Sequence, residues 1–127
     1  MTKTFVGYGV DAVSLAPVSP GIEVDGWLFV SGQVALDPAA GKLQLGTIQE
    51  ETHLVLQNIG KILEQGGCGF EDVVRTTIHI GTLDDFAGMN EVYREYFSGV
   101  LPTRTTVQSG LFGGCKVEID AIARIPR

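Results

Sequence analysis

The chain has 127 residues, of which 44% are hydrophobic and 19% are charged. This composition is typical of a globular protein and excludes a disordered chain. At this length we expect a single domain, residues 1–127, with an ordinary hydrophobic core. The 15 Asp and Glu residues outnumber the 9 Lys and Arg residues, and the net charge is −6. Because the chain has no basic cluster to bind phosphates, we expect no nucleic-acid partner.

Membrane, targeting, metal and disulfide signals are all weak. The apolar runs are too short to cross a bilayer, and the N-terminus MTKTFVGYG does not resemble a signal peptide. We therefore expect a cytoplasmic protein without a membrane partner. Cys68 and Cys115 cannot build a disulfide framework, and Cys115 follows Gly113-Gly114, where we expect an exposed but unactivated thiol. His53 and His79 have no partner at metal-ligand spacing, so we expect no metal site.

The first third of the chain is predicted to form strands. Asp25-Gly26 separates two apolar runs, residues 22–24 and 27–30. This pattern predicts a hairpin, because both turn residues can take the positive φ angles of a type I′ turn. A weaker strand signal covers residues 4–6, and residues 37–41 are predicted to form a turn.

The middle of the chain is predicted to alternate helix and strand. A helix is expected over residues 48–65, because Thr47 and Glu50 fit a capping box and Gly66-Gly67 ends it. A β-branched strand is expected over residues 73–80, followed by a second helix over residues 83–97 that Thr82 and Asp85 can cap. Apolar residues recur at helical spacing in both helices: Val55, Ile59, Ile62 and Leu63, then Phe86, Met89, Tyr93 and Phe97.

The last quarter is predicted to form two strands, residues 103–109 and 116–125, joined by a glycine-rich turn. In the second strand, alternate residues from Val117 to Ala123 are apolar, whereas Glu118 and Asp120 face the other way. Strands that alternate with two long helices predict an α+β or α/β layer with the helices packed on one face of the sheet.

Polar residues on these last two strands form the first candidate site. Arg104 and Thr106 share one face of the penultimate strand, and Glu118 lies on the next strand. If the two strands are antiparallel neighbours, Arg104 and Glu118 come together. They then form either a simple ion pair, worth about 0.2–1 kcal/mol, or a carboxylate receptor beside a proton-transfer group.

Two more positions are candidate binding residues. Asn90 continues the apolar stripe of the second helix, where an amide must either bond to the backbone or line a wet cavity. Ser31 and Gly32 end the strongest predicted strand, where Gly32 allows close approach of a ligand and Ser31 offers a hydroxyl. A bulge or a strand-end turn explains the same two residues without a ligand.

The order of several motifs along the chain resembles the Rid family, the reactive intermediate deaminases, also called the YjgF or L-PSP family. The resemblance covers nearly the whole chain. The matching segments, in order, are LFVSGQ at 28–33, DP at 37–38, QNI at 57–59, DVVRTT at 72–77, NEVY at 90–93, PTRTTV at 102–107 and VEIDAIA at 117–123.

The resemblance implies a fold, an assembly and an activity. It implies a chorismate-mutase-like α+β domain that forms a homotrimer around a central barrel, with sites between neighbouring subunits. It implies hydrolysis of enamine and imine intermediates, such as 2-aminoacrylate, to 2-keto acids and ammonia without a metal or cofactor. The family's catalytic roles match Arg104 and Glu118, and its substrate-binding positions match Ser31, Gly32 and Asn90.

Two further substrate-binding positions depart from the family pattern. Val18 stands where the deaminases usually carry a tyrosine, and Thr106 stands where a cysteine is common. We therefore expect a different substrate range. Two other functions remain open: a non-catalytic protein that binds small carboxylates in the same cleft, and an endoribonuclease or translation inhibitor, which the net charge of −6 disfavours.

Overall fold

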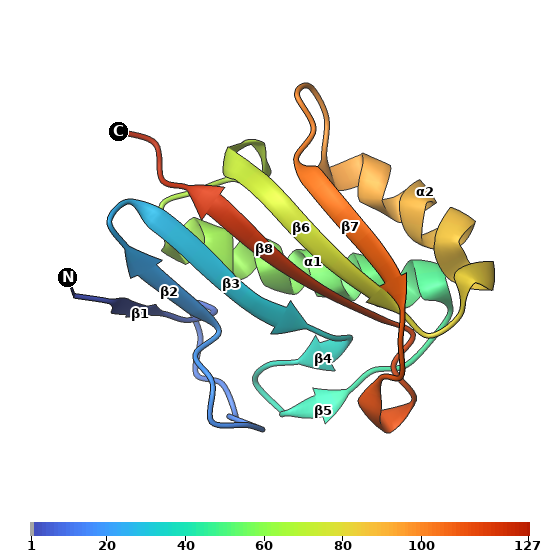
Figure 1. Cartoon of the computed structure of the whole chain (residues 1–127). Coiled ribbons are helices and arrows are strands. Elements are labelled where there is room, and N and C mark those ends of the chain that lie inside the picture. The colour runs from blue at the N-terminus through green and yellow to red at the C-terminus, as the bar shows by residue number, and fades with distance from the viewer. Residues whose placement is uncertain (1) are drawn as a thin grey trace.

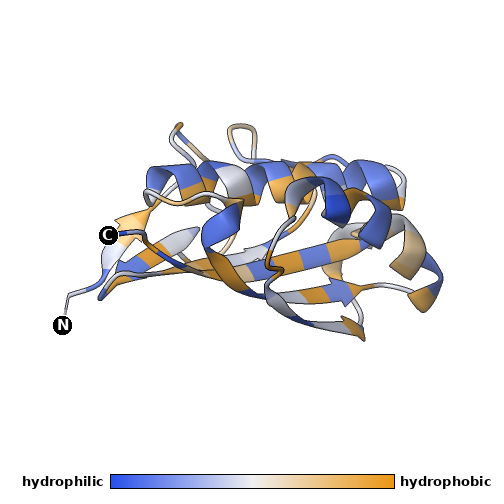
Figure 2. Cartoon of the chain, turned by 90° about the horizontal axis from the view of Figure 1, so that it is seen from above, coloured by the Kyte–Doolittle hydropathy of each residue, from blue (hydrophilic) through white to orange (hydrophobic). Residues whose placement is uncertain are grey.

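The computed structural model describes residues 2–127. A mixed sheet of six strands forms one layer, and both helices cover the same face of it (Figures 1 and 2). The predicted α+β arrangement, with both helices on one face, is thereby confirmed. No helix within residues 2–127 is long and apolar enough to cross a membrane.

The strands are short at the N-terminus and longer in the centre of the sheet. In chain order the elements are β1 (Thr4–Val6), β2 (Gly21–Val24), β3 (Trp27–Gln33), β4 (Leu36–Asp37), β5 (Lys42–Leu43), α1 (Ile48–Gln65), β6 (Val73–Ile80), α2 (Phe86–Tyr96), β7 (Thr103–Gln108) and β8 (Val117–Arg124). The large sheet has the order β1-β2-β3-β8-β6-β7, and β4 and β5 form a separate ribbon (Figure 1).

The position of β8 corrects one sequence-based expectation. We expected β7 and β8 to be adjacent antiparallel strands, but β8 pairs with β3 and β6, and β7 pairs in parallel with β6 at the edge of the sheet. The crossover through α2 returns the chain beside β6 in the same direction, as helical crossovers do. The apolar residues of β8 are then buried in the middle of the sheet under α1.

Local signals in the sequence located most elements correctly. The β2–β3 turn has positive φ at both Asp25 (52°) and Gly26 (80°), as a type I′ turn requires. At the start of α1, the backbone N–H of Glu50 donates to Thr47 Oγ1 at 3.1 Å, and the backbone N–H of Thr47 donates to Glu50 Oε1 at 2.9 Å. The capping box therefore sets the first residue of α1 as predicted.

The second helix is shorter than the predicted span of residues 83–97. A 3₁₀ turn, Leu83–Asp85, comes first, and Thr82 caps this turn by accepting a hydrogen bond from the backbone N–H of Asp84 at 3.2 Å. Asp85 makes no side-chain capping bond, and α2 begins at Phe86 and ends at Tyr96. The regular α-helix therefore begins at Phe86, three residues later than predicted.

The hydrophobic core lies between the sheet and the two helices. The predicted stripe of α1 is fully buried there. Of the apolar stripe predicted for the second helix, Met89, Tyr93 and Phe97 are buried, whereas Phe86 is 41% exposed. No helix or strand of the described chain covers the opposite face of the sheet (Figure 2). The strand alternation and register place the exposed side chains of Trp27, Phe29 and Val107 on this face.

Candidate functional site

The sheet register places Arg104 and Glu118 on opposite faces. Residues in register across neighbouring strands point to the same face. Arg104 is in register with Thr76, which is in register with Ala121, and both are buried beneath the helices. Glu118 is in register with His79 and alternates with the buried residues of β8, so its side chain points to the uncovered face. The predicted cross-strand pair of Arg104 and Glu118 is therefore wrong within one chain.

Aromatic side chains of α2 hold the guanidinium of Arg104. Its Cζ lies 4.9 Å from the ring centroid of Tyr93 and 5.6 Å from that of Phe86. The hydroxyl of Tyr93 is hydrogen-bonded to Thr76 Oγ1 at 2.8 Å, and burial raises the pKa of Tyr93. A guanidinium stacked on aromatic faces keeps its N–H donors in one orientation. Arg104 is thus oriented at the edge of the sheet.

Asn90 and Thr106 belong to the same edge as Arg104. Asn90 lies one helical turn after Phe86, so it shares the face of α2 that contacts Arg104. Thr106 is the next residue of β7 on the face of Arg104, and its Oγ1 is buried without a hydrogen-bond partner in the described part of the chain. Buried hydroxyls normally have partners. Thr106 therefore has a hydrogen bond to offer a ligand or a water. We call Arg104, Asn90, Thr106, Phe86 and Tyr93 the arginine edge.

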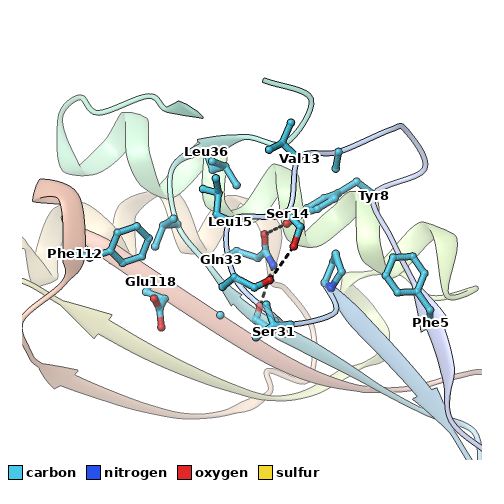
Figure 3. Close-up of a pocket in the computed structure, with 16 residues that line it drawn as sticks. Phe5, Tyr8, Val13, Ser14, Leu15, Ser31, Gln33, Leu36, Phe112 and Glu118 are labelled. Carbon is cyan, nitrogen blue, oxygen red and sulfur yellow. Dashed lines mark hydrogen bonds between the residues drawn. The ribbon is translucent and has the colours of Figure 1, made fainter. Parts of the chain in front are cut away.

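The remaining predicted site residues line a cavity on the other side of the molecule (Figure 3). Its volume is about 260 Å³, and it contains Val18, Ser31, Gly32 and Glu118. The segment between β1 and β2 forms one wall, and Phe112, from the loop before β8, forms another. Four of the seven predicted residues thus come together from three separate regions of the chain.

A β-bulge shapes the floor of this cavity. Val30 pairs with Ala121 and Gln33 pairs with Ile119, so β3 has one more residue than β8 between these two pairs. The extra residue falls at Ser31-Gly32, where the sequence had allowed either a bulge or a ligand site. Bulges are frequent beside active sites because they re-aim side chains. The bulge is therefore confirmed, and the same two residues line the cavity.

Hydrogen bonds tie the bulge to the preceding segment. Ser31 Oγ donates to the carbonyl of Ser19 at 2.6 Å, and the backbone N–H of Ser31 donates to the carbonyl of Pro20 at 2.9 Å. An ideal Cβ at Gly32 would lie only 2.7 Å from Glu118 Oε2. Glycine at this position therefore leaves space for the carboxylate of Glu118.

Sequence reasoning missed Gln33 and Tyr8 as parts of the site. Gln33 is only 4% exposed; its Oε1 accepts from the Tyr8 hydroxyl at 2.8 Å, and its Nε2 donates to the carbonyl of Ser31 at 3.1 Å. Burial raises the pKa of Tyr8. Gln33 stood beside Ser31-Gly32 in the motif and could have been found, but Tyr8 lies 25 residues away and gave no local signal.

A buried carboxylate anchors the strand that carries Glu118. Glu51 of α1 is fully buried and accepts from the backbone N–H of Lys116 at 2.9 Å and from that of Gly46 at 3.2 Å. Its Oε2 also lies 3.4 Å from Lys116 Nζ. These contacts hold the start of β8, two residues before Glu118. Sequence reasoning missed Glu51, since nothing local distinguishes it from the exposed Glu50 beside it.

Neither cysteine is a candidate nucleophile. Cys115 is 5% exposed, so the expected exposure of its thiol was wrong, and burial raises its pKa. Burial, with Asp72 and Glu71 nearby, raises the pKa of Cys68 to about 11. A thiol with a raised pKa holds little thiolate at neutral pH.

Each histidine is partly exposed and lies within hydrogen-bond distance of a neighbouring hydroxyl. His53 Nδ1 lies 3.0 Å from the Tyr96 hydroxyl, and His79 Nδ1 lies 2.9 Å from Ser109 Oγ. Across residues 2–127, no three His, Cys, Asp or Glu side chains gather closely enough to hold a metal ion.

The comparisons with known proteins agree with one another. The family model described as Endoribonuclease L-PSP matches residues 10–125. A mouse protein named 2-iminobutanoate/2-iminopropanoate deaminase is 43% identical over 111 residues, which cover 87% of this chain and 82% of that protein.

Two solved structures extend the likeness to the fold. A candidate endoribonuclease from Thermotoga maritima superposes with a TM-score of 0.91 at 38% identity, covering 99% of this chain and 100% of that one. A Yersinia pestis protein of the conserved Rid family superposes with a TM-score of 0.89 at 33% identity, and the match covers 98% of this chain and 100% of that one.

Proposed function

The chain belongs to the Endoribonuclease L-PSP family, also called the Rid family, and on this premise we propose that it hydrolyses 2-imino acids to 2-keto acids and ammonia. Enamines such as 2-aminoacrylate enter the reaction as their imine tautomers. The name of the mouse relative supports the activity. The observation that carries the proposal is the cavity that brings Glu118 against the Ser31-Gly32 bulge, while Arg104 is held as an oriented cation elsewhere on the chain.

The site is completed by a second copy of the chain. Arg104 and Glu118 project from opposite faces of one sheet, so a single chain cannot direct both at one small substrate. In a closed ring, unlike surfaces of successive copies meet. A homotrimer of this kind places the arginine edge of one copy against the cavity of the next. The exposed Trp27, Phe29 and Val107 on the uncovered face support such an assembly, because it removes them from water.

Arg104 binds and orients the substrate. A 2-imino acid carries a carboxylate, and a guanidinium binds a carboxylate through two parallel N–H···O bonds that fix its direction as well as its charge. The buried Thr106 hydroxyl and the Asn90 amide lie on the same edge and supply further polar contacts. The iminium carbon is thereby placed at the mouth of the Glu118 cavity.

Glu118 directs water onto that carbon. The carboxylate accepts a proton from the water as its oxygen bonds to carbon 2, and the C=N bond becomes a C–N single bond. Glu118 then passes this proton to the nitrogen. As the C–N bond breaks and ammonia leaves, Glu118 accepts the second proton, from the hydroxyl on carbon 2, and the C=O bond forms. The iminium is already electrophilic, so proximity supplies most of the acceleration and no covalent intermediate is needed.

Mixing two inactive variants tests both the residues and the assembly. Arg104→Ala and Glu118→Gln are each expected to hydrolyse the imine no faster than water does without the protein. After the two are refolded together, random mixing leaves about one subunit boundary in four with both side chains intact. Activity should return to about a quarter of the wild-type level. No recovery despite verified mixed oligomers would contradict a shared site, and wild-type activity in either single variant would refute the residue's role.

Two further measurements separate imine hydrolysis from the two other functions. Calorimetric binding of a 2-keto acid without any acceleration of imine hydrolysis would favour a non-catalytic carboxylate-binding protein. RNA cleavage by highly purified protein would favour an endoribonuclease, which the net charge of −6 opposes.

A further inference from the structure

We propose that the cavity beside Glu118 selects 2-imino acids with large apolar side chains, and that Leu15, Val18 and Phe112 determine this preference. The proposal rests on the proposed deaminase function, since it names the substrate class of the same site. It departs from the small substrates in the mouse relative's name, 2-iminobutanoate and 2-iminopropanoate.

Exposed apolar side chains converge on this one cavity. Leu15 is 56% exposed, Phe112 is 59% exposed and Val18 is 63% exposed, yet all three line the same space (Figure 3 labels the first two). They come from segments about 100 residues apart in the sequence. Single apolar residues scattered over a surface need no explanation, but a convergent group marks a binding surface. Val34 and Leu36 add two buried apolar side chains to the lining.

The uncharged polar side chains that line the cavity already have internal partners. The Tyr8 hydroxyl donates to Gln33, Ser14 Oγ donates to the carbonyl of Ala16, and Ser31 Oγ donates to the carbonyl of Ser19. Gln33 is bonded through both its oxygen and its nitrogen. A polar substrate side chain would lose its water here without gaining free partners. The lining therefore favours an apolar occupant.

The position of Glu118 determines which part of the substrate enters. Among the described lining residues Glu118 alone is charged, and it must lie beside the water that attacks carbon 2. The carboxylate of the substrate points to Arg104 of the neighbouring copy, so the side chain on carbon 2 is left to enter the apolar space. A volume of about 260 Å³ is far more than a methyl group fills. An acidic side chain is repelled by Glu118.

A comparison of three substrates tests the preference. Amino-acid oxidases generate the imino acids of alanine, leucine and glutamate in the assay mixture. Semicarbazide in the same mixture competes with the protein for each imine, and the rate of keto-acid formation is measured. A single methylene in an apolar pocket changes kcat/KM about 10-fold or more. We expect kcat/KM for the leucine-derived imine to exceed that for the alanine-derived imine at least about 10-fold, with the glutamate-derived imine lowest.

The possible failures are distinguishable. Equal or reversed preference between the leucine- and alanine-derived imines, with hydrolysis clearly accelerated, would overturn the specificity proposal and leave the deaminase function standing. No acceleration with any of the three imines would overturn the deaminase function itself.

Two variants assign the preference to the cavity wall. Leu15→Ala and Phe112→Ala remove exposed side chains, so the fold is retained, and each should lower the leucine-to-alanine ratio of kcat/KM about 10-fold. Leu45→Ala is the matched control, because Leu45 is similarly exposed but does not line the cavity, and its ratio should equal that of the wild type. A changed sedimentation coefficient with an unchanged ratio would show that the wall is a subunit contact and would overturn the proposal.

Discussion

Gly32 and Glu118 are in contact across the β3–β8 boundary. An ideal Cβ on Gly32 would lie 2.7 Å from Oε2 and 3.0 Å from Cδ of Glu118. Real Cβ atoms do not approach other atoms so closely, and the Glu118 side chain is the part that can move. The absence of a side chain at Gly32 therefore sets where the carboxylate lies.

Gly32→Ala should impair catalysis without unfolding the protein. The added methyl group displaces the Glu118 carboxylate by about 1 Å, which can cost about 100-fold in rate. We expect kcat to fall by that order while the free energy of unfolding changes by less than about 1 kcal/mol. Gly110→Ala is the control, because a Cβ there meets nothing within 4 Å. Wild-type kcat in Gly32→Ala would mean that the position of Glu118 is not critical.

Arg104→Lys should weaken substrate binding although the charge is kept. Lysine lacks the planar fork that binds a carboxylate at two points, and it stacks less well on Tyr93 and Phe86. We expect KM to rise about 10-fold or more, with weaker calorimetric binding of a 2-keto acid. Arg124→Lys is the control, because Arg124 also lies 4.9 Å from an aromatic centroid, that of Trp27, but outside the cavity and the arginine edge. An unchanged KM in Arg104→Lys would argue against carboxylate binding by this residue.

Thr106→Val should separate stability from binding. The Thr106 hydroxyl is buried without a partner in the described chain, so its removal should raise the free energy of unfolding by about 1 kcal/mol. The same change should weaken binding of a 2-keto acid if the hydroxyl bonds to the ligand. Thr76→Val is the contrast: it leaves the Tyr93 hydroxyl without its partner and should destabilise the fold by about 1–3 kcal/mol. Equal destabilisation by both variants would contradict this account.

Glu51→Ala should be the most destabilising of these changes. It leaves the backbone N–H groups of Lys116 and Gly46 without their acceptor and removes the partner of the Lys116 ammonium. We expect a loss of about 3 kcal/mol in denaturant unfolding. Glu64→Ala, at an exposed position of the same helix, should cost less than about 0.5 kcal/mol. Similar losses in the two variants would show that the buried carboxylate is not an anchor.

Asp120 should make stability depend on pH. Burial raises the pKa of Asp120 above its ordinary value of 3.8, although His79, Thr77 and Arg75 oppose the shift. The folded protein therefore binds this proton more tightly than the unfolded chain does, and ionisation of Asp120 disfavours folding at neutral pH. Asp120→Asn should have a higher free energy of unfolding than the wild type at pH 7. The difference in free energy of unfolding between Asp120→Asn and the wild type should shrink as the pH falls through the raised pKa toward 3.8. A difference that does not change with pH would show that ionisation of Asp120 is not its cause.

The sequence located elements whose causes are local. The type I′ turn at Asp25-Gly26 depends on two residues, and the start of α1 depends on Thr47 and Glu50. The apolar periodicity of β8 likewise predicted which of its residues are buried. The motifs shared with the family also marked Arg104 and the other candidate site positions, whose roles stay predictions, since each motif is a short run of neighbouring residues.

Relations between distant segments were decided only by the tertiary structure. The sequence does not show that β8 lies between β3 and β6, because strand order follows from how α2 returns the chain beside β6 and from which strand gains most by central burial. That order places Arg104 and Glu118 on opposite faces, brings Tyr8 to Gln33, and buries Glu51 against Lys116. Each of these contacts joins residues far apart in the chain, and packing of the whole core, not the residues beside them, determines where they meet.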